Sequence, residues 1–371
     1  SINQLMTNLI PAGFYYKTFM WPNWHFFEPY IRRIAGLANA PRQAPSSGQY
    51  ESRNWFCDIL IVGAGPAGLM AALAAARSGA RTVLVDDGTR AGGGLLNRKD
   101  RINDQPSCDW VQDITDELDS LSTVVRLQQS IAWAYREQNL VIVTERHPEP
   151  KQLIQRTWRI RARRVIIATG AIERSLVFAN NDRPGVMLAS AAQAYVNRYV
   201  ALPGRRAVIF TNNDSAYQVA IDMMAAGIKV VAIVDCRDDS AAGSHPLPDN
   251  IPRVKNHVVT GVLGRRRVNA VSLRSNEHGD TRKIMCDLLC VSGGWNPTVH
   301  LYSQSRSALR YDDALAAFIP HEPAQPCDCV GAAAGEFGLQ KILVDGLESG
   351  ARAVSDCGFQ AMKTAVPSTS A

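Results

Sequence analysis

The apolar positions of this chain are most regularly patterned between residues 57 and 86. An apolar run over 57–62, broken only by Asp58, ends on the sequence GAGPAG at 63–68 and continues into an alanine-rich stretch at helical spacing. This pattern predicts a buried strand, a tight glycine turn and a helix N-terminus, the arrangement that holds a pyrophosphate. Gly79 is placed to end the helix, and 82–85 predicts a second strand.

An acidic residue follows that second strand at the spacing expected for a ribose contact. Asp86 lies 23 positions after Gly63 (86 − 63), close to the spacing at which an acid reaches a ribose 2′-OH. A glycine turn in an ordinary parallel sheet is the weaker alternative. The run AGGGL at 91–95 lets backbone approach a ligand across the sheet edge.

Further along, 109–121 predicts a helix, and 130–135 with 140–143 predicts a hairpin. Arginines alternate over 159–164 and lead into the apolar run 165–170, which closes on Ala-Thr-Gly. A strand with this ending resembles the one that passes beneath the first nucleotide in the two-dinucleotide-domain flavoproteins. The fold we expect is therefore α/β with two Rossmann-type βαβ lobes.

A second βαβ pattern occupies 206–235, with strands at 206–210 and 229–234 and a helix at 215–226. Its turn reads TNNDSA at 211–216, where that superfamily carries glycines. Bulky side chains and a carboxylate stand where phosphate oxygens need bare N–H groups. We expect this second site to have kept its fold and lost ordinary NAD(P)H binding.

The last segment bears on which nucleotide the first site holds. In FAD enzymes of that superfamily the corresponding strand end carries Gly-Asp, and the carboxylate binds the ribityl chain; here Gly331 is followed by Ala332. A buried ribityl hydroxyl without its acceptor would cost about 1–3 kcal/mol. We therefore expect NAD at the first site in preference to FAD.

Composition and charge exclude several classes of protein. The chain has 371 residues, a net charge of +6 and eight cysteines. Its basic runs are not interleaved with aromatic residues, so we expect no nucleic-acid binding. No apolar run is long enough to span a bilayer and no signal-peptide pattern is present, which predicts a cytoplasmic protein without membrane contact. Cys327 and Cys329 are a poor metal site, and we expect buried thiols and no metal.

Aromatic residues crowd into the first thirty positions without a clear period. We expect this segment to cover apolar surface, either on this chain or on a partner subunit, and we do not expect a free amphipathic helix. Residues 41–49, rich in Pro, Ser, Gln and Gly, predict a linker.

Four long strings make the chain resemble the α subunit of heterotetrameric sarcosine oxidase. They are PAGFYYKTFMWP at 11–22, NDRPGVM at 181–187, TNNDSAY at 211–217 and GGWNPT at 293–298. The resemblance runs from about residue 5 to about residue 350. The family usually has a ferredoxin-like domain before this region and an aminomethyltransferase-like domain after it. Neither is in this sequence, so we expect either a short relative or part of a longer gene product.

The resemblance implies an NAD-binding subunit of an amine-oxidising complex. Its partners would be a β-like flavoprotein subunit carrying FAD, an FMN at the interface with that subunit, and small γ- and δ-like subunits. The substrate would be a small amine, sarcosine or one of the related amines, oxidised on the partner, so no catalytic residue is expected here. The expected cofactor-binding residues are Gly63, Gly65, Pro66, Ala67 and Gly68 at the pyrophosphate, Asp86 at the ribose, Gly94 and Leu95 along the middle, Ile131 near adenine, Thr169 and Gly170 beneath, and Gly331 opposite.

Two other functions stay open: a stand-alone FAD-dependent NAD(P)H oxidoreductase, and a non-catalytic assembly subunit. The expected domains are an aromatic-rich extension and linker at 1–50, a first dinucleotide-binding domain at 51–172 plus 299–371, and a second, degenerate one at 173–298.

Overall fold

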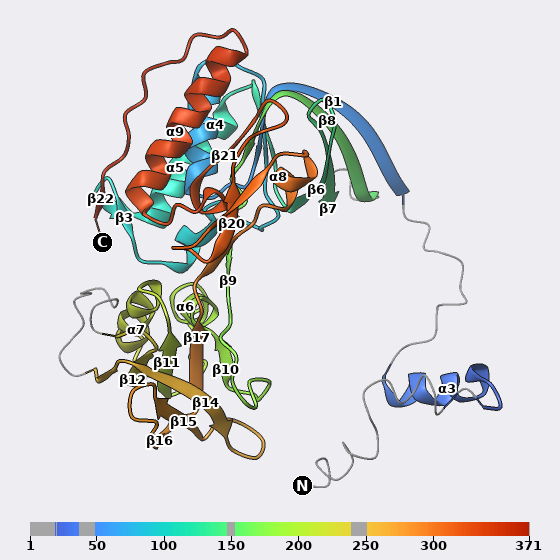
Figure 1. Ribbon diagram of the computed structural model, residues 1–371. Coiled ribbons are helices and arrows are strands. Elements are labelled where there is room, and N and C mark those ends of the chain that lie inside the picture. The colour runs from blue at the N-terminus through green and yellow to red at the C-terminus, as the bar shows by residue number, and fades with distance from the viewer. Residues whose placement is uncertain (1–18, 20, 37–48, 147–152, 239–250, 371) are drawn as a thin grey trace. The chain divides into compact units, whose positions relative to one another are not determined.

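The computed structural model describes residues 19, 21–36, 49–146, 153–238 and 251–370. It divides into two compact units, Ser1–Gly48 and Gln49–Ala371. The second unit carries two lobes, each built on its own sheet (Figure 1).

The first unit contains the helix α3 (Trp24–Ile34), which begins where the side chain of Asn23 accepts the N–H of Phe26. None of its residues is buried, and Trp24, Phe26, Tyr30 and Ile34 are exposed. The expectation that this segment would not form an amphipathic helix is wrong. Phe27, Tyr30, Ile31 and Ile34 follow a helical spacing that the surrounding aromatic residues obscure.

The first lobe is built on a seven-stranded sheet in the order β5-β2-β1-β8-β7-β6, with β21 also paired to β8. The pairs among β5, β2, β1, β8 and β21 are parallel, whereas β8-β7-β6 is antiparallel. The strands are β1 (Gln49–Val62), β2 (Thr82–Val85), β5 (Val124–Leu127), β6 (Ser130–Arg136), β7 (Leu140–Arg146), β8 (Leu153–Ile167) and β21 (Cys327–Cys329).

Three helices of this lobe gather beside that sheet: α4 (Pro66–Arg77), α5 (Ser107–Ser120) and α9 (Leu339–Asp356) (Figure 1). Helices α4 and α9 pack closely because small residues face each other. A Cβ added at Gly346 would lie 2.3 Å from the carbonyl oxygen of Ala67, and one at Gly350 would lie 2.6 Å from that of Ala71. This packing fixes α4, whose N-terminus follows the glycine loop.

The second lobe has a five-stranded parallel sheet in the order β10-β17-β11-β12-β13. Helices α6 (Ala189–Asn197) and α7 (Ser215–Ala225) pack on it, and an antiparallel sheet β14-β15-β16 adjoins it. Its strands are β10 (Val186–Leu188), β11 (Arg206–Thr211), β12 (Lys229–Asp235), β13 (Arg253–Val254), β14 (His257–Leu263), β15 (Ala270–Ser275), β16 (Thr281–Met285) and β17 (Leu288–Ser292).

The chain crosses between the lobes twice, on β9 (Ala171–Glu173) and β18 (Trp295–Pro297), which pair antiparallel. The remaining short elements belong to the first lobe's side of these crossings. They are β3 (Arg101–Ile102), β4 (Gln105–Pro106), β19 (Leu309–Asp312), β20 (Ala317–Pro320), β22 (Thr369–Ser370), α8 (His300–Gln304) and the 3₁₀ turns η1 (Gly93–Asn97) and η2 (Gly331–Ala334).

The expected fold class and most of the expected elements are confirmed. Strand β2 has the expected bounds, the hairpin is β6-β7, and Gly79 and Gly227 follow the ends of α4 and α7 with positive φ. Strand β17 starts at Leu288, and Cys286, two positions before it, has a buried side chain as expected of the thiols.

Candidate nucleotide site

The loop between β1 and α4 is shaped by two glycines that no other residue can replace. Gly63 has φ +105°, and a Cβ there would lie 2.2 Å from the carbonyl oxygen of Ala168. A Cβ at Gly68 would lie 1.8 Å from the carbonyl oxygen of Gly63. Both positions therefore need glycine for the loop to pack against the end of β8, whatever the loop binds.

Gly65 differs from those two glycines because it borders open space. A Cβ at this position would have no atom within 4 Å, and its φ of −74° suits any residue. It immediately precedes α4, which begins at Pro66 and has no side-chain cap. The uncapped N–H groups and the helix dipole favour an anion at this point, so Gly65 leaves room where a pyrophosphate would lie.

Asp86 lies at the carboxyl end of β2 and is hydrogen-bonded to the glycine loop. Its Oδ2 accepts the N–H of Ala64 at 2.7 Å, and its Oδ1 accepts the N–H of Gly88 at 2.9 Å. Burial raises the pKa of Asp86, and these two backbone N–H donors partly oppose the shift. A carboxylate has about four acceptor positions; with the Gln128 amide as a third donor, one remains for a ribose hydroxyl.

The side chain of Gln128 also contacts Asp86, and the sequence analysis did not predict this contact. Its Nε2 donates to Asp86 Oδ1 at 3.0 Å and to the carbonyl oxygen of Gly88 at 2.8 Å. It also lines a cavity of about 210 Å³ with Arg90 and Arg126. Gln128 lies in a turn after β5 with no motif around it, so the sequence carries no signal for this contact.

The glycine run after Asp86 lies against the glycine loop. Gly92 N–H donates to the carbonyl oxygen of Ala64 at 2.8 Å, and a Cβ at Gly93 would lie 3.0 Å from the Cα of Gly65. Gly94 is exposed and borders open space. The side chain of Leu95 is 2% exposed in the hydrophobic core, so a ligand can contact only its backbone.

The other expected site residues lie around the same loop. A Cβ added at Gly63 would lie 3.3 Å from the backbone nitrogen of Thr169, and one added at Gly331 would lie 2.9 Å from the Cβ of Ala67. Thr169 Oγ1 donates to the carbonyl oxygen of Thr298 at 2.7 Å, and Gly170 follows with φ +73°. Ile131 comes directly after Ser130, whose N–H donates to the Asp86 carbonyl.

No side-chain acceptor occupies the turn opposite the loop. The turn η2 has the sequence Gly-Ala-Ala-Ala, and Ala332 stands second in it. The carboxylate that follows, Glu336, uses Oε1 to accept the N–H of Gly338 at 2.7 Å. The turn η2 itself therefore offers no carboxylate for a ribityl hydroxyl at the position of Ala332.

In the second lobe, the side chain of Asn213 fills the loop between β11 and α7. Its Oδ1 accepts the Ser215 Oγ hydroxyl at 2.6 Å and the Ser215 N–H at 3.2 Å. Its Nδ2 donates to the Oγ and the carbonyl oxygen of Ser292, at 3.0 and 3.2 Å. Trp295 Nε1 donates to the Ser215 Oγ at 3.0 Å. One N–H of the first turn of α7, that of Ser215, is thus bound by a side chain of the loop, although the N-cap residue Asp214 forms no side-chain cap.

The acid at the end of the second lobe's β12 is also engaged within the protein. Asp235 is 1% exposed, and its Oδ2 accepts hydrogen bonds from Tyr217 and Arg237, both at 2.8 Å. Arg237 also pairs with Asp214 at 2.6 Å. Burial, with the neighbouring Asp235, raises the pKa of Tyr217 to about 12. The N–H and Nε of Arg237 donate to Asp235 Oδ1 as well, so the four acceptor positions of Asp235 are occupied, whereas Asp86 keeps one.

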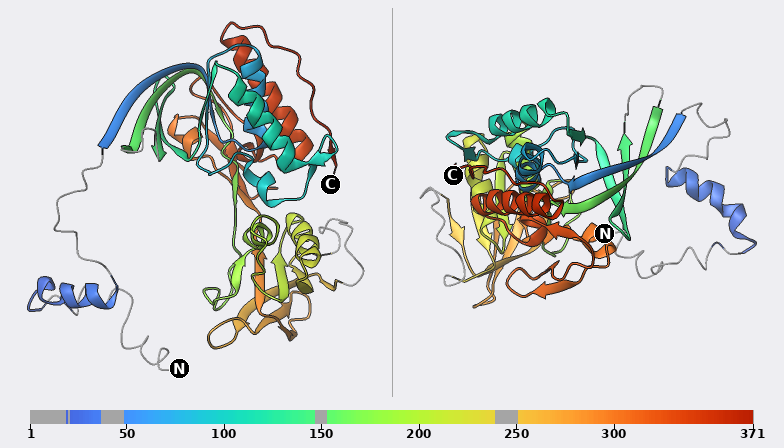
Figure 2. Two further views of the ribbon diagram at one scale, coloured as in Figure 1. Left: turned by 180° about the vertical axis from the view of Figure 1, so that it is seen from behind. Right: turned by 90° about the horizontal axis from the view of Figure 1, so that it is seen from above.

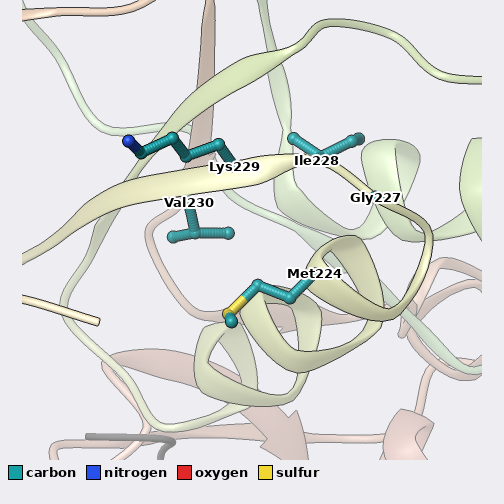
Figure 3. A pocket seen from close by; sticks show the side chains of 5 residues that line it. All are labelled: Met224, Gly227, Ile228, Lys229 and Val230. Atoms are coloured by element: carbon teal, nitrogen blue, oxygen red, sulfur yellow. The ribbon is translucent and has the colours of Figure 1, made fainter. Parts of the chain in front are cut away.

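The described residues offer little other chemistry. They contain no group of three or more metal-ligating side chains and no helix long and apolar enough to cross a membrane. Burial raises the pKa of Cys327 and Cys329, which makes their thiolates unfavourable. A pocket of about 240 Å³ between the end of α7 and the start of β12 is lined by Met224, Val230 and the exposed Lys229 (Figure 3), without a second polar side chain.

Comparison with known proteins places these features among nucleotide-binding oxidoreductases. The family model described as "Pyridine nucleotide-disulphide oxidoreductase" matches residues 57–316. The chain is 39% identical to sarcosine oxidase subunit alpha of Rhizobium meliloti (strain 1021) over 99% of its own length, and 36% identical to that of Corynebacterium sp. (strain P-1) over 84%. These alignments cover 37% and 34% of the relatives, so the chain spans about a third of their length.

Among solved structures, T. acidophilum thioredoxin reductase has a similar fold. The TM-score is 0.64 at 20% sequence identity, covering 81% of this chain and 98% of that one. The expected resemblance to the sarcosine oxidase α chains is confirmed by the sequence relatives, and the expected fold by the family match and this structure.

Proposed function

This chain belongs to the pyridine nucleotide-disulphide oxidoreductase family, and from that premise we propose that it is the NAD-binding α subunit of a multi-subunit flavoprotein amine oxidase or dehydrogenase. Its first lobe holds NAD, and its second lobe holds no dinucleotide. The relatives of which it covers about a third bear the name sarcosine oxidase subunit alpha, which supports the choice of an amine-oxidising complex.

The observation that carries the proposal is the contrast between the two nucleotide loops. At the first loop, Gly65 borders open space and Asp86 keeps an acceptor position. At the second, the amide of Asn213 already satisfies Ser215 and Ser292. A dinucleotide at the second loop would compete with these hydrogen bonds, and leaving the buried Ser292 unpaired would cost about 1–3 kcal/mol.

The residues of the first lobe fit NAD better than FAD. The N–H groups at the start of α4 would bind the pyrophosphate and Asp86 the adenosine ribose, with Ile131 near adenine. Thr169, Gly170 and Gly331 close the loop from the other side, and Gly94 with the backbone of Leu95 lies along the middle. Ala332 supplies no ribityl acceptor. When bound, NAD would either carry hydride on its nicotinamide or remain tightly bound and stabilise the fold.

The amine chemistry belongs to the partners in this proposal. A β-like flavoprotein subunit carries FAD and oxidises a small amine, FMN lies at its interface with this chain, and small γ- and δ-like subunits complete the complex. This chain contributes no catalytic residue. The raised pKa values of its buried thiols support that assignment, as does the absence of two cysteines at Cys-x-x-Cys spacing in the sequence.

The test is native purification followed by mass analysis of the subunits and of the cofactors released by mild denaturation. We expect NAD from this chain and flavins from a co-purifying subunit. An isolated chain that is yellow and bleaches with NADH would instead be a stand-alone FAD-dependent NAD(P)H oxidoreductase. A complex that releases flavins without NAD would make this chain a non-catalytic assembly subunit.

A further inference from the structure

The outer part of the first lobe's sheet is four strands wide and open on one side. Strand β1 pairs with β8 along its whole length, from Gln49 to Val62, but β2 pairs with it only from Ile59 onward. Figures 1 and 2 show β1 and β8 arching side by side away from α4 and α9. Within the described residues, no strand pairs with the second edge of β1 between residues 49 and 57, which leaves a template for another strand.

The two faces of this outer sheet differ in charge pairing. On the inner face, Arg156 pairs with Glu51 at 2.5 Å and Glu145 at 3.1 Å, and its guanidinium lies 5.2 Å from the ring centroid of Trp158. Arg53, also on this face, pairs with Glu51 at 2.6 Å. The inner face therefore carries its own carboxylates.

The outer face carries exposed aromatic and arginine side chains. The strand register aligns Phe56 with Arg161 and Asn54 with Arg159, and then these arginines with Leu140 and Ile142 on β7. Trp133 joins this face because its Nε1 donates to Thr144 Oγ1 at 3.0 Å. We call this set the arginine face: Tyr50, Phe56, Trp133, Arg136, Arg159 and Arg161.

No carboxylate neutralises the arginine face within the described residues. Arg161 donates only to the amide and carbonyl oxygens of Gln138, and no Asp or Glu pairs with Arg136 or Arg159. Tyr50, Phe56 and Trp133 are 68%, 62% and 52% exposed. Exposed aromatic residues with arginine, and without lysine, have the composition of protein–protein interface centres.

We propose that the arginine face and the open edge of β1 bind an acidic surface of another protein subunit, one that presents a strand to β1 and Asp or Glu side chains to Arg136, Arg159 and Arg161. This inference rests on the proposed function, which makes the chain a subunit of a complex. The backbone edge offers N–H and C=O groups in strand register, which a protein strand complements and a nucleic acid does not.

Charge favours an acidic subunit over two other candidates for this face, the chain's own helix α3 and a second copy of the chain. The chain's own helix α3 carries Arg32 and Arg33, and its one carboxylate, Glu28, already pairs with Arg32 at 2.7 Å. It would bring more positive charge to the arginine face. A second copy docked about a two-fold axis would place these arginines against each other. An acidic subunit avoids both repulsions.

The test uses the natively purified complex with the photo-crosslinking residue p-benzoylphenylalanine at Asn54, and a matched probe at the exposed Arg274 on β15. We expect the probe at Asn54 to link to an Asp- and Glu-bearing segment of a co-purifying subunit, and the probe at Arg274 to give no such link. The variant R159E/R161E should retain about tenfold less of that subunit. R265E/R266E, with the same charge change at an exposed loop of the second lobe, should retain it fully.

Cross-links from Asn54 to residues 1–48, to a second copy or to nucleic acid would overturn the inference, as would no cross-link or unchanged retention by R159E/R161E. Co-purifying subunits that do not link to Asn54 would refute only this interface. A chain that purifies alone and without NAD would refute the proposed function as well.

Discussion

The N–H of Ala64 donates a 2.7 Å hydrogen bond to Oδ2 of Asp86. This contact joins the glycine loop to the end of the neighbouring strand β2, so the two parts of the nucleotide site form one hydrogen-bonded unit. In the second lobe the corresponding acid, Asp235, is instead bound by Tyr217 and Arg237. The proposal that only the first lobe binds a dinucleotide rests in part on this difference in hydrogen bonding.

Gly65→Ala should weaken NAD binding and leave the fold intact. The new methyl group would enter open space on the ligand side of the loop, with an ordinary φ of −74°. Crowding a bound pyrophosphate by one methyl group costs about 1–3 kcal/mol, or about a 5- to 150-fold loss of affinity. Isothermal titration of nucleotide-free protein measures the loss, and circular dichroism checks the fold.

Gly68→Ala is the matched contrast, because its methyl group would lie 1.8 Å from the carbonyl oxygen of Gly63. We expect this variant to lose about 3 kcal/mol of unfolding free energy, measured by denaturant titration. Equal stability of the two alanine variants would show that the loop does not pack as described.

Asn213→Ala should destabilise the second lobe without creating a nucleotide site. It removes the acceptor for the Ser215 N–H and the donor to Ser292, which predicts a loss of about 1–2 kcal/mol. Asn212→Ala is the control, because the Asn212 side chain accepts only from Asn213. Equal melting temperatures for the two variants would contradict the role given to Asn213. Tight NADPH binding at the second lobe of the unmodified chain would contradict the proposal that this lobe binds no dinucleotide.

Glu173→Gln should raise stability at neutral pH and lose its advantage in acid. Burial raises the pKa of Glu173, whose Oε2 accepts the Ser190 N–H at the start of α6. The folded chain then binds more protons than the unfolded chain between the ordinary and the raised pKa, so stability falls as pH rises through that window. Glutamine keeps an acceptor oxygen and removes this loss. Thermal melts of both proteins from pH 4 to 8 measure the difference, and parallel curves would contradict it.

The sequence predicts the loops of the candidate site better than it predicts the contacts between residues far apart in the chain. Apolar runs, glycines and an acid at fixed spacing identify β1, α4, β2 and Asp86 because each follows from local chain geometry. Gln128 reaches Asp86 from 42 positions away, and no local pattern records such a contact. Leu95 was expected along the cofactor, but its side chain packs in the core. A single apolar residue in a glycine run does not show whether its side chain faces the ligand or the hydrophobic core.

The arginine run shows the same limit. Alternation over 159–164 predicts a strand with one polar face, and β8 confirms it. Only the register with β1 and β7 shows that the outer arginines lie beside Phe56 and Ile142, without the carboxylates that pair with Arg156 on the opposite face.

The nucleotide content of Asp86→Ala, compared with that of Asp87→Ala, tests the central claim most directly. Both variants remove one carboxylate, but Asp87 is exposed, whereas Asp86 accepts the N–H of Ala64 in the glycine loop. Loss of a charged acceptor for the ribose costs about 1.5–3 kcal/mol, so Asp86→Ala should bind NAD about 10- to 150-fold more weakly. We predict that purified Asp86→Ala releases little NAD while Asp87→Ala releases as much as the unmodified chain. Equal NAD content in all three proteins would contradict the assignment of the first lobe as the NAD site.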